Sequence, residues 1–443
     1  MIGVSKTMDK AVKEILADPQ TGVFQIVLEF NSKDKKNILT VDRLLTDILI
    51  EQDFNAKFSD IFMVFFKVTI QQYLLLFKHF QGLTCTILIS NASNETVNKS
   101  SSPFFQYTYR VVIKNMEDLF KEISANALED VDGTGASLQY EDTFIDLTVQ
   151  LVEMELYNIR KHKFNMILTQ VTMEDIIYLF AYLLGIGKVF LVPPDNTRRY
   201  SQYVISPLKT IFDVFSYLQN KPDGGVYNKG LSYYYSLGIL YVYPAFETNL
   251  TPYSDAINIY RVPENTYMGI GGLSRKTKVS TNVICNLASK ASKIAQLGME
   301  EIGTVFLTQL NSKIIDGQLT ITDTEIVVNE NSDTFANDVN NGLINNAYTP
   351  DFRECNDNKY TLFSELNSYN YEVQHLTVGN IPLFLFKAGS RISYNFDKAA
   401  LFTTKMGTVT KAVYSFIGDD RKIVKSFSTQ ASLDIITNMK DGI

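Results

Sequence analysis

Apolar and polar residues alternate with a period of two over several short stretches in the first quarter of the chain. In the first of these, Phe24, Ile26 and Leu28 share one face with Phe30, and Gln25, Val27 and Glu29 share the other. The stretches Leu83–Ile89 and Tyr107–Ile113 repeat the alternation. Because successive side chains of a strand point to opposite faces, the pattern predicts half-buried strands.

The segment between these strands carries acidic and aromatic residues together. Ile50–Asp60 indicates a mostly extended acidic arm that runs into a further strand, and Ile70–Phe80 indicates a short helix rich in Leu and Tyr. Several half-buried strands with one short helix are typical of a small antiparallel β-barrel. We therefore predict an N-terminal extension over 1–19 and a first barrel over 20–114.

The hydrophobic pattern becomes mixed between residues 115 and 250, which we predict to form an α/β domain. Thr172 and Asp175 resemble a capping box before an apolar stripe, and Pro207 suits the first position of a second helix. The expected elements are a helix Met116–Ala127, a strand Phe144–Leu151, a helix from Thr172 to Leu184, a strand Lys188–Val192, a helix opening at Ser206-Pro207, and a hydrophobic strand ending at Pro244.

Residues 251–443 return to short alternating stretches and predict a second barrel. An Asn/Asp-rich region at about 320–360 has few apolar residues and predicts a long excursion from it. The expected strands are Ile257–Val262, Tyr267–Ile270, Leu383–Phe386, Ile392–Phe396, and a hairpin of Val413–Ile417 with Lys422–Phe427. The fold class predicted for the whole chain is α+β, mainly β.

Composition narrows the choice of partners. The 443 residues include 29 Phe and 25 Tyr but no Trp, and Tyr in such numbers suits wide protein–protein contacts. The net charge is −7, and no cationic run is longer than Arg198-Arg199 or Arg421-Lys422. This argues against nucleic acid as the main partner.

The cysteines and the apolar runs indicate in which cellular compartment the protein folds. Cys85, Cys285 and Cys355 are isolated, which predicts reduced thiols and not a disulfide framework. Charged residues and glycines interrupt Met173–Phe190, so no membrane span is expected. Met1–Pro19 carries charges throughout and is unlike a signal peptide. We expect synthesis and folding in a cytoplasm.

No group of residues indicates catalysis, a cofactor or a metal, and we predict none of the three. His79, His162 and His375 have no carboxylate or Cys at ligand spacing, and the cysteines have no CxxC context. The glycine-rich stretches 133–137 and 269–272 fit ordinary turns better than a phosphate cradle. The pairs Glu153/Glu155 and Asp419/Asp420 are expected to be solvated, although paired carboxylates can also serve acid–base chemistry.

Two aromatic segments are candidate interfaces. In the arm, Phe54 and Phe58 are expected to pack on a neighbouring barrel, with carboxylates such as Asp53 in solvent or near cations. The alternative is that the arm is an internal strand pair of its own barrel. The run Tyr233, Tyr234 and Tyr235 lacks a basic lining, so packing or an interface is favoured over stacking on bases or sugars.

The order of these segments resembles the baseplate hub proteins of contractile-tailed bacteriophages. The resemblance covers roughly residues 20–436. The segments that carry it are the arm Ile50–Phe54, then Pro207–Phe215 and Gly230–Pro244 in the mixed domain, and Phe386–Tyr394 in the second β unit.

The resemblance implies a structural virion protein located in the tail baseplate. In that family two tube-like barrels per subunit let a homotrimer adapt a hexameric tail tube to a trimeric central spike. The implied partners are tube or tube-initiator proteins, the spike, and baseplate wedge proteins, with DNA only passing through the lumen. Large obligate interfaces of this kind need aromatic and apolar area.

Other classes remain open on the sequence. A tail tube or distal tail protein would also be all-β and ring-forming, but the mixed middle domain argues against a simple tube subunit. A glycan-cleaving tail component would need two carboxylates at a fixed separation. A glycan-binding component has only the Tyr run in its favour.

Overall fold

A computed structural model represents the chain. The residues that it describes are 5–17, 23–54, 59–91, 103, 105–113, 144–159, 162–221, 223–247, 256–262, 274–277, 280–285, 287–288, 292–293, 305–308, 311–315, 318–322, 325–327, 353–355, 358, 360–361, 364, 371–379, 381–398, 401–419 and 426–438. They form a mainly β protein with a few helices, as the sequence predicts.

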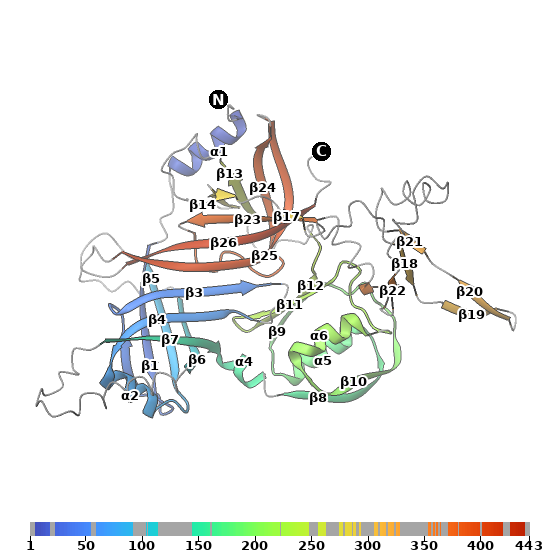
Figure 1. Cartoon of the computed structure of the whole chain (residues 1–443), viewed down its shortest axis with the longest axis horizontal. Coiled ribbons are helices and arrows are strands. Elements are labelled where there is room, and N and C mark those ends of the chain that lie inside the picture. The colour runs from blue at the N-terminus through green and yellow to red at the C-terminus, as the bar shows by residue number, and fades with distance from the viewer. Residues whose placement is uncertain are drawn as a thin grey trace, which may run out of the picture.

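Eight strands close into a first ring of antiparallel pairs, which we call ring one (Figure 1). β25 and β26 pair with each other, so the order returns to its start. The strands in order around ring one are β1 (Val23–Asn31), β5 (Thr84–Asn91), β6 (Phe105–Ile113), β7 (Phe144–Glu153), β4 (Ile61–Thr69), β3 (Leu45–Asp53), β25 (Leu401–Asp419) and β26 (Ser426–Asn438), and β2 (Asn37–Val41) pairs with β1.

A second ring, which we call ring two, shares β25 and β26 with ring one and contains the opposite end of each of these strands. β15 pairs with β13 and β14, and β16 pairs with β23, so ring two is completed by the chain through residue 286 between β15 and β16 and not by a pairing of these two strands. The strands in order are β25, β24 (Arg391–Lys398), β13 (Ala256–Arg261), β15 (Ser280–Cys285), β16 (Leu287–Ala288), β23 (Tyr371–Gly379) and β26, while β14 (Ser274–Lys276) and β17 (Ser292–Lys293) extend its edges.

The long hairpin β25–β26 therefore belongs to both rings. On one edge of β25, the residues 411–415 pair with β3 of ring one and the residues 401–408 pair with β24 of ring two. On the outer edge of β26, Phe427 and Ser428 pair with β1, and the residues 430–438 pair with β23. One continuous hydrophobic core accordingly runs through both rings.

Alternating burial accounts for the strands of ring one. In β4, Phe62, Val64 and Phe66 are buried while the residues between them are partly exposed. Burying each such side chain contributes roughly 1.5–3 kcal/mol. The expected helix is α2 (Ile70–Lys78), which Thr69 caps through a capping box with Gln72. The strands predicted near residues 24–30, 83–89 and 107–113 are confirmed.

The middle domain has its own core and joins ring one at the end of β7. The helix expected after Thr172 is confirmed, together with its capping box to Asp175. β7 itself, which the expected boundary at 115 assigns to this domain, pairs between β4 and β6 of ring one. The elements of the middle domain are α4 (Met154–Ile159), β8 (Lys163–Val171), α5 (Met173–Leu183), β9 (Lys188–Leu191), β10 (Tyr200–Thr210), α6 (Ile211–Asn220), β11 (Leu231–Ser236) and β12 (Ile239–Pro244).

Pro207 does not open a helix, contrary to the sequence prediction. It lies in β10, and α6 begins only at Ile211. The pairing of β10 with β8 skips from Ile205 to Lys209, which marks a bulge or irregularity at the proline. A proline lacks the N–H that a regular ladder needs, so a bulge tolerates it.

One prediction at the C-terminus is also corrected. Leu383–Phe386 is not a strand: Leu383 and Phe384 form a turn, in which Phe384 has a positive φ of 54°. The predicted hairpin is confirmed by the pairing of β25 with β26, and residues 420–425 lie outside the described residues. The expected elements Met116–Ala127 and Tyr267–Ile270 lie outside the described residues.

The N-terminal extension contains a helix that the sequence reading missed, α1 (Lys6–Ala17). Its residues Met8, Val12 and Ile15 pack against Val262 and Ile284 of ring two. Five short strands of the region 305–355 lie apart from both rings in two small sheets, namely β18 (Val305–Thr308), β19 (Asn311–Ile315), β20 (Gln318–Thr322), β21 (Glu325–Val327) and β22 (Arg353–Cys355).

Candidate functional site

The hairpin β11–β12 connects the middle domain to ring one. Its strands alternate between two cores: Tyr234 and Tyr241 lie in the core of the rings, whereas Tyr235 and Leu240 lie in the core of the middle domain. Since successive residues of a strand face opposite sides, one hairpin packs on both bodies. The tyrosine run is therefore a joint inside the chain.

Three carboxylates gather where this hairpin meets ring one. Asp60 accepts hydrogen bonds from the hydroxyl of Tyr234, from Nε2 of Gln52 at 3.1 Å and from Oγ of Ser236 at 3.2 Å. The amide orientation of Gln52 leaves its Oε1 buried without a partner. Asp60 thus fastens β11 to the end of β3.

Glu153 and Glu155 fasten the tip of the same hairpin. Glu153 accepts hydrogen bonds from the backbone N–H of Leu237 at 3.0 Å and from the hydroxyl of Tyr107 at 3.1 Å. Glu155 accepts one from the hydroxyl of Tyr235. We call Asp60, Glu153 and Glu155 with these hydroxyl donors the acid–tyrosine cluster.

Burial raises the pKa of several groups in the acid–tyrosine cluster. Desolvation raises the pKa of Asp60, and it raises the pKa of Glu153 to about 7, with the charges of Asp60 and Glu155 adding to the effect on Glu153. Desolvation and the Glu155 carboxylate likewise raise the pKa of Tyr235. The expectation that Glu153 is solvated is wrong, because only 4% of it is exposed, whereas Glu155 is exposed as expected.

The residues expected at an interface lie in different environments. Phe54 is 1% exposed, its ring contacts that of Tyr234 edge-on with centroids 4.9 Å apart, and its carbonyl accepts a hydrogen bond from Tyr243. Tyr234 and Tyr235 are buried too, and the ring of Tyr233 stacks on Phe215.

The side chains of Phe54, Tyr234 and Tyr235 are buried within the single chain, and their expected role in contacts between protomers stays a prediction. Ile50–Asp53 of the arm belong to β3, which pairs with β4 of the same ring, as in the internal alternative that the sequence left open. Asp53 is half-buried at the end of β3, opposite Lys411 of β25. Phe58 lies outside the described residues.

No described histidine or thiol lies in the cluster. His375 meets a carboxylate that is distant in sequence: its Nδ1 lies 2.5 Å from Oδ1 of Asp434 on the neighbouring strand. Within the described ranges no group of three His, Cys, Asp or Glu residues could hold a metal ion. Cys85 and Cys285 are buried, and neither forms a disulfide. Both glycine-rich stretches fall outside the described residues.

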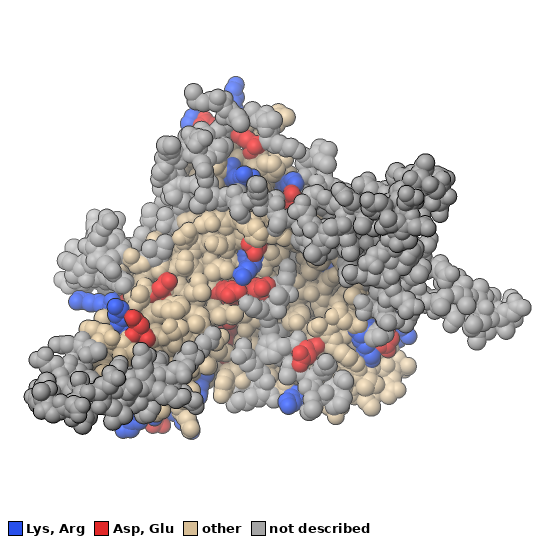
Figure 2. Space-filling model, in the orientation of Figure 1, with Lys and Arg blue, Asp and Glu red and all other residues tan. Residues whose placement is uncertain are grey.

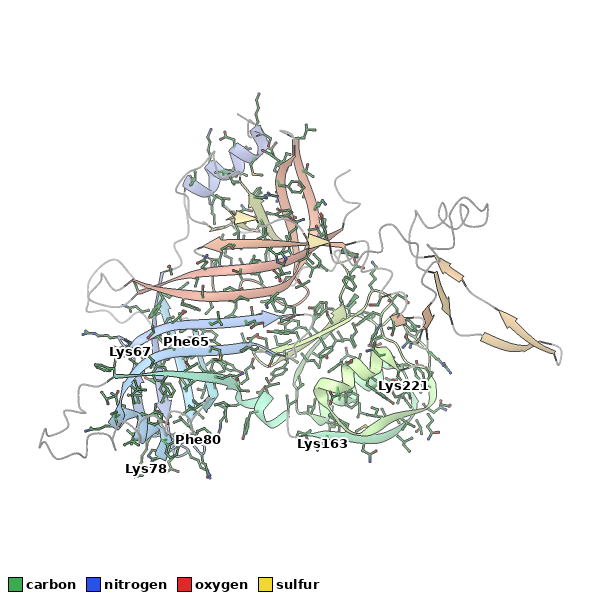
Figure 3. All side chains as sticks on the ribbon, viewed as in Figure 1. Phe65, Lys67, Lys78, Phe80, Lys163 and Lys221 are labelled. Carbon is green, nitrogen blue, oxygen red and sulfur yellow. The ribbon has the colours of Figure 1, made fainter. Side chains whose placement is uncertain are left out.

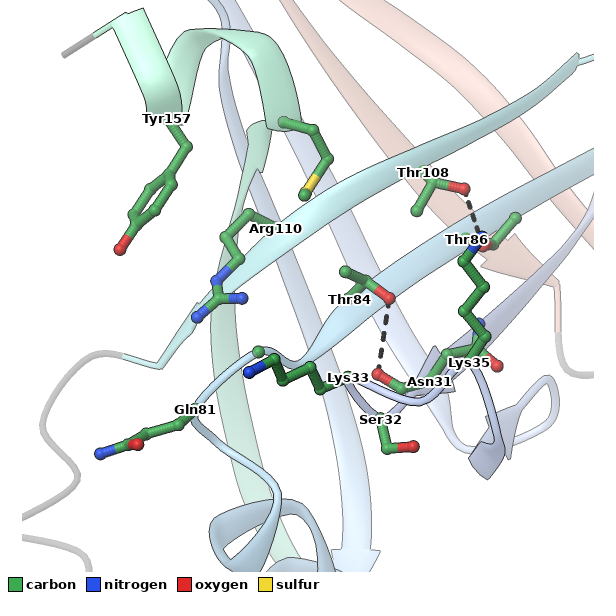
Figure 4. Close-up of a pocket in the computed structure, with 12 residues that line it drawn as sticks. Asn31, Ser32, Lys33, Lys35, Gln81, Thr84, Thr86, Thr108, Arg110 and Tyr157 are labelled. Atoms are coloured by element: carbon green, nitrogen blue, oxygen red, sulfur yellow. Dashed lines mark hydrogen bonds between the residues drawn. The ribbon is translucent and has the colours of Figure 1, made fainter. Parts of the chain in front are cut away.

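A separate pocket of about 890 Å³ opens on the outer face of ring one, next to α4 (Figure 4). We call it the β1–β5–β6 pocket. Hydroxyl and amide groups dominate its wall, and Thr86 and Thr108 hydrogen-bond each other at 3.0 Å across β5 and β6. The lining residues are Asn31, Ser32, Lys33, Lys35, Gln81, Gly82, Thr84, Thr86, Thr108, Arg110, Met154 and Tyr157.

Charges on the molecular face shown in Figure 2 are scattered, with both signs close together and no wide area of one sign among the coloured residues. That face offers no broad cationic track of the kind that follows a nucleic-acid backbone. Among the described helices, none has the length and apolar character needed to cross a membrane.

Comparison with solved structures finds phage tail and secretion proteins. The chain is similar to a tail protein from Neisseria meningitidis MC58, with 12% identity, a TM-score of 0.49, and coverage of 94% of this chain and 98% of that one. It is also similar to the 43 kDa tail protein of prophage MuSo2 from Shewanella oneidensis, with 11% identity, a TM-score of 0.48, and coverage of 93% and 96%.

A third similar structure is a component of the E. coli type VI secretion system, described as structurally similar to T4 bacteriophage tail proteins. Here the identity is 8%, the TM-score is 0.38, and the coverage is 90% of this chain and 75% of that one. No protein-family model matches the chain, and no curated protein sequence matches it.

Proposed function

We propose that this protein is the central hub of a contractile-tail baseplate and acts as a homotrimer between a hexameric tube and a trimeric spike. The observation that carries the proposal is the presence of two rings of strands in one chain, ring one closed by strand pairings and ring two completed by the chain between β15 and β16. Three copies would present six rings, which is the number needed to meet a sixfold partner with a threefold assembly.

The shared hairpin supports this role mechanically. Since β25 and β26 close both rings, the two rings are joined by continuous backbone and by one hydrophobic core. A pair of rings held in this way keeps a fixed relative position, which an adapter between two symmetries requires. The proposed contacts are with tube or tube-initiator proteins on one side and with the spike on the other, and wedge proteins are further candidates.

The location that follows is the phage particle, after assembly in the host cytoplasm, with DNA passing through the lumen without specific contacts. The proposal includes no catalytic step and no cofactor. In the acid–tyrosine cluster, Asp60, Glu153 and Glu155 each accept a hydrogen bond from the hairpin β11–β12, which is a structural use of these residues.

Sedimentation equilibrium of the purified protein tests the assembly. We expect a mass three times that of the 50.2 kDa chain, stable on dilution through the micromolar range. Obligate interfaces bury more than the ~1,600 Å² of a standard complex, so dilution should not dissociate it. A stable monomer would contradict the proposal.

A tail tube or distal tail protein is the second candidate, because it too would be built from rings of strands. It predicts a hexamer or an open polymer in the same experiment. The middle domain, with its own core of residues such as Ile176, Phe180 and Phe215, favours the hub over a simple tube subunit.

A further inference from the structure

Three cationic side chains line the β1–β5–β6 pocket, and Glu29, the cross-strand partner of Thr86, lies outside the lining. Lys33 and Lys35 come from the turn between β1 and β2, and Arg110 comes from β6. The twelve lining residues include no Asp and no Glu. Asp34 lies between the two lysines in sequence but is not part of the lining. For a chain of net charge −7, this is an unusual concentration of one sign.

Two of these cationic residues make packing contacts beside the pocket. The guanidinium carbon of Arg110 lies 5.3 Å from the centre of the Tyr157 ring, a cation–π contact that restrains this side chain. Gly82, with a φ of 104°, lies so close to Lys33 that an added Cβ would sit 2.9 Å from the Lys33 Cβ. Packing therefore restrains the guanidinium of Arg110 and the base of the Lys33 side chain.

Neutral hydrogen-bonding groups complete the wall. Thr84, Thr86 and Thr108 lie across β5 and β6, and Figure 4 shows Arg110, Lys33 and Gln81 on one side of the pocket. Two like charges that face the same space repel each other, and an anion between them removes this repulsion. Arginine binds a carboxylate through two parallel N–H···O bonds.

We propose that the β1–β5–β6 pocket binds a carboxylate-rich segment of a partner protein. Nucleic acid fits less well, because a single-strand site stacks bases on aromatic rings, and the only aromatic side chain in the lining, Tyr157, is already covered by Arg110. The proposal names a partner class that the hub assignment does not require, and it does not depend on the trimer.

The test uses the full-length protein and a fluorescein-labelled oligoglutamate peptide, with binding followed by fluorescence anisotropy at low and at physiological salt. We expect binding that weakens as salt rises, since exposed charges are screened within about 10 Å at 0.1 M. Arg110→Gln and Lys33→Ala should each weaken binding roughly tenfold, and Arg110→Lys should recover part of the loss, because lysine keeps the charge without the fork.

Lys163→Ala is the matched control. It removes the same charge from an exposed position on β8 of the middle domain, which is labelled in Figure 3 and is not part of the pocket lining, and it should leave the affinity unchanged. Melting temperatures show whether each variant remains folded.

Three results would overturn the proposal: no binding at low salt, equal binding by Arg110→Gln and the wild type, or binding of an oligothymidylate but not of oligoglutamate. Sedimentation of the same samples separates this test from the proposed function. A monomer that still binds the peptide contradicts the hub and leaves the pocket assignment standing.

Discussion

Gly225 shows how closely single residues are fitted in the middle domain. Its φ is 97°, its N–H donates to the Leu218 carbonyl at 2.8 Å, and its carbonyl accepts from Asn196 at 2.7 Å. An added Cβ would lie 2.2 Å from Cδ2 of Tyr360. Gly225→Ala therefore combines backbone strain with a steric clash and should cost roughly 3 kcal/mol of unfolding free energy, measured by urea denaturation.

Gly187→Ala is the control for this substitution. An added Cβ there meets nothing within 4 Å, so the change should stay within about 0.5 kcal/mol of the wild type. Equal destabilisation by the two substitutions would contradict the described packing around Gly225.

The raised pKa of Glu153 predicts that the stability of the protein depends on pH. Burial raises its pKa to about 7, above the ordinary 4.5, so the folded state holds a proton that the unfolded state releases. The contribution of Glu153 to the free energy of unfolding is then fully present below about pH 4.5. It is lost as the pH rises through about 7, and the loss amounts to at most roughly 3 kcal/mol. The pKa of Asp60 is raised as well and acts in the same direction.

Denaturation midpoints across this pH range test the assignment. Glu153→Gln cannot ionise, so its stability should fall less than that of the wild type between about pH 5 and pH 8. Asp175→Asn is the control: hydrogen bonds from Thr172 lower the pKa of Asp175, so this variant should lose stability at neutral pH yet keep the decline toward pH 8. An unchanged decline in Glu153→Gln would refute the role of Glu153.

Among the secondary-structure elements, the hairpin β25–β26 has the widest influence because both rings depend on it. Phe416 of β25 is 1% exposed and lies in the shared core. Phe416→Ala should cost about 3–5 kcal/mol and should raise amide hydrogen exchange in β5 of ring one and in β23 of ring two together.

Phe180→Ala provides the contrast, because Phe180 is buried in the separate core of the middle domain. It should raise exchange in α5 and β8 more than in the rings. If Phe416→Ala affected ring one alone, the two rings would not be coupled through the hairpin.

Local patterns predict elements well where the sequence decides the structure locally. Period-two alternation located β1, β5 and β6, and the Thr172–Asp175 pair located the start of α5. The prediction failed at Pro207, where a strand bulge tolerates a residue that is also favoured at a helix start, and at Phe384, whose positive φ ends the apolar run. Both outcomes depend on tertiary pairing that a local pattern does not contain.

For the whole molecule, the sharing of the hairpin β25–β26 by both rings and the acid–tyrosine cluster could not be predicted from the sequence, although the hairpin itself was. Asp60 and Tyr234 are 174 residues apart, and Glu153 meets Leu237 across 84 residues. No spacing rule links such positions. The sequence singled out the tyrosine run for packing or an interface, and Tyr234 and Tyr235 are buried in the two cores on opposite faces of β11.

Electron cryomicroscopy of the purified protein would show directly whether it is a trimeric hub. We expect three chains around one axis, each contributing ring one and ring two, so that six rings surround a central channel with near-sixfold symmetry. The two rings of each chain should be joined by β25 and β26. A particle of six chains with one ring each at the axis, or a particle in which only one ring per chain lines the channel, would contradict it.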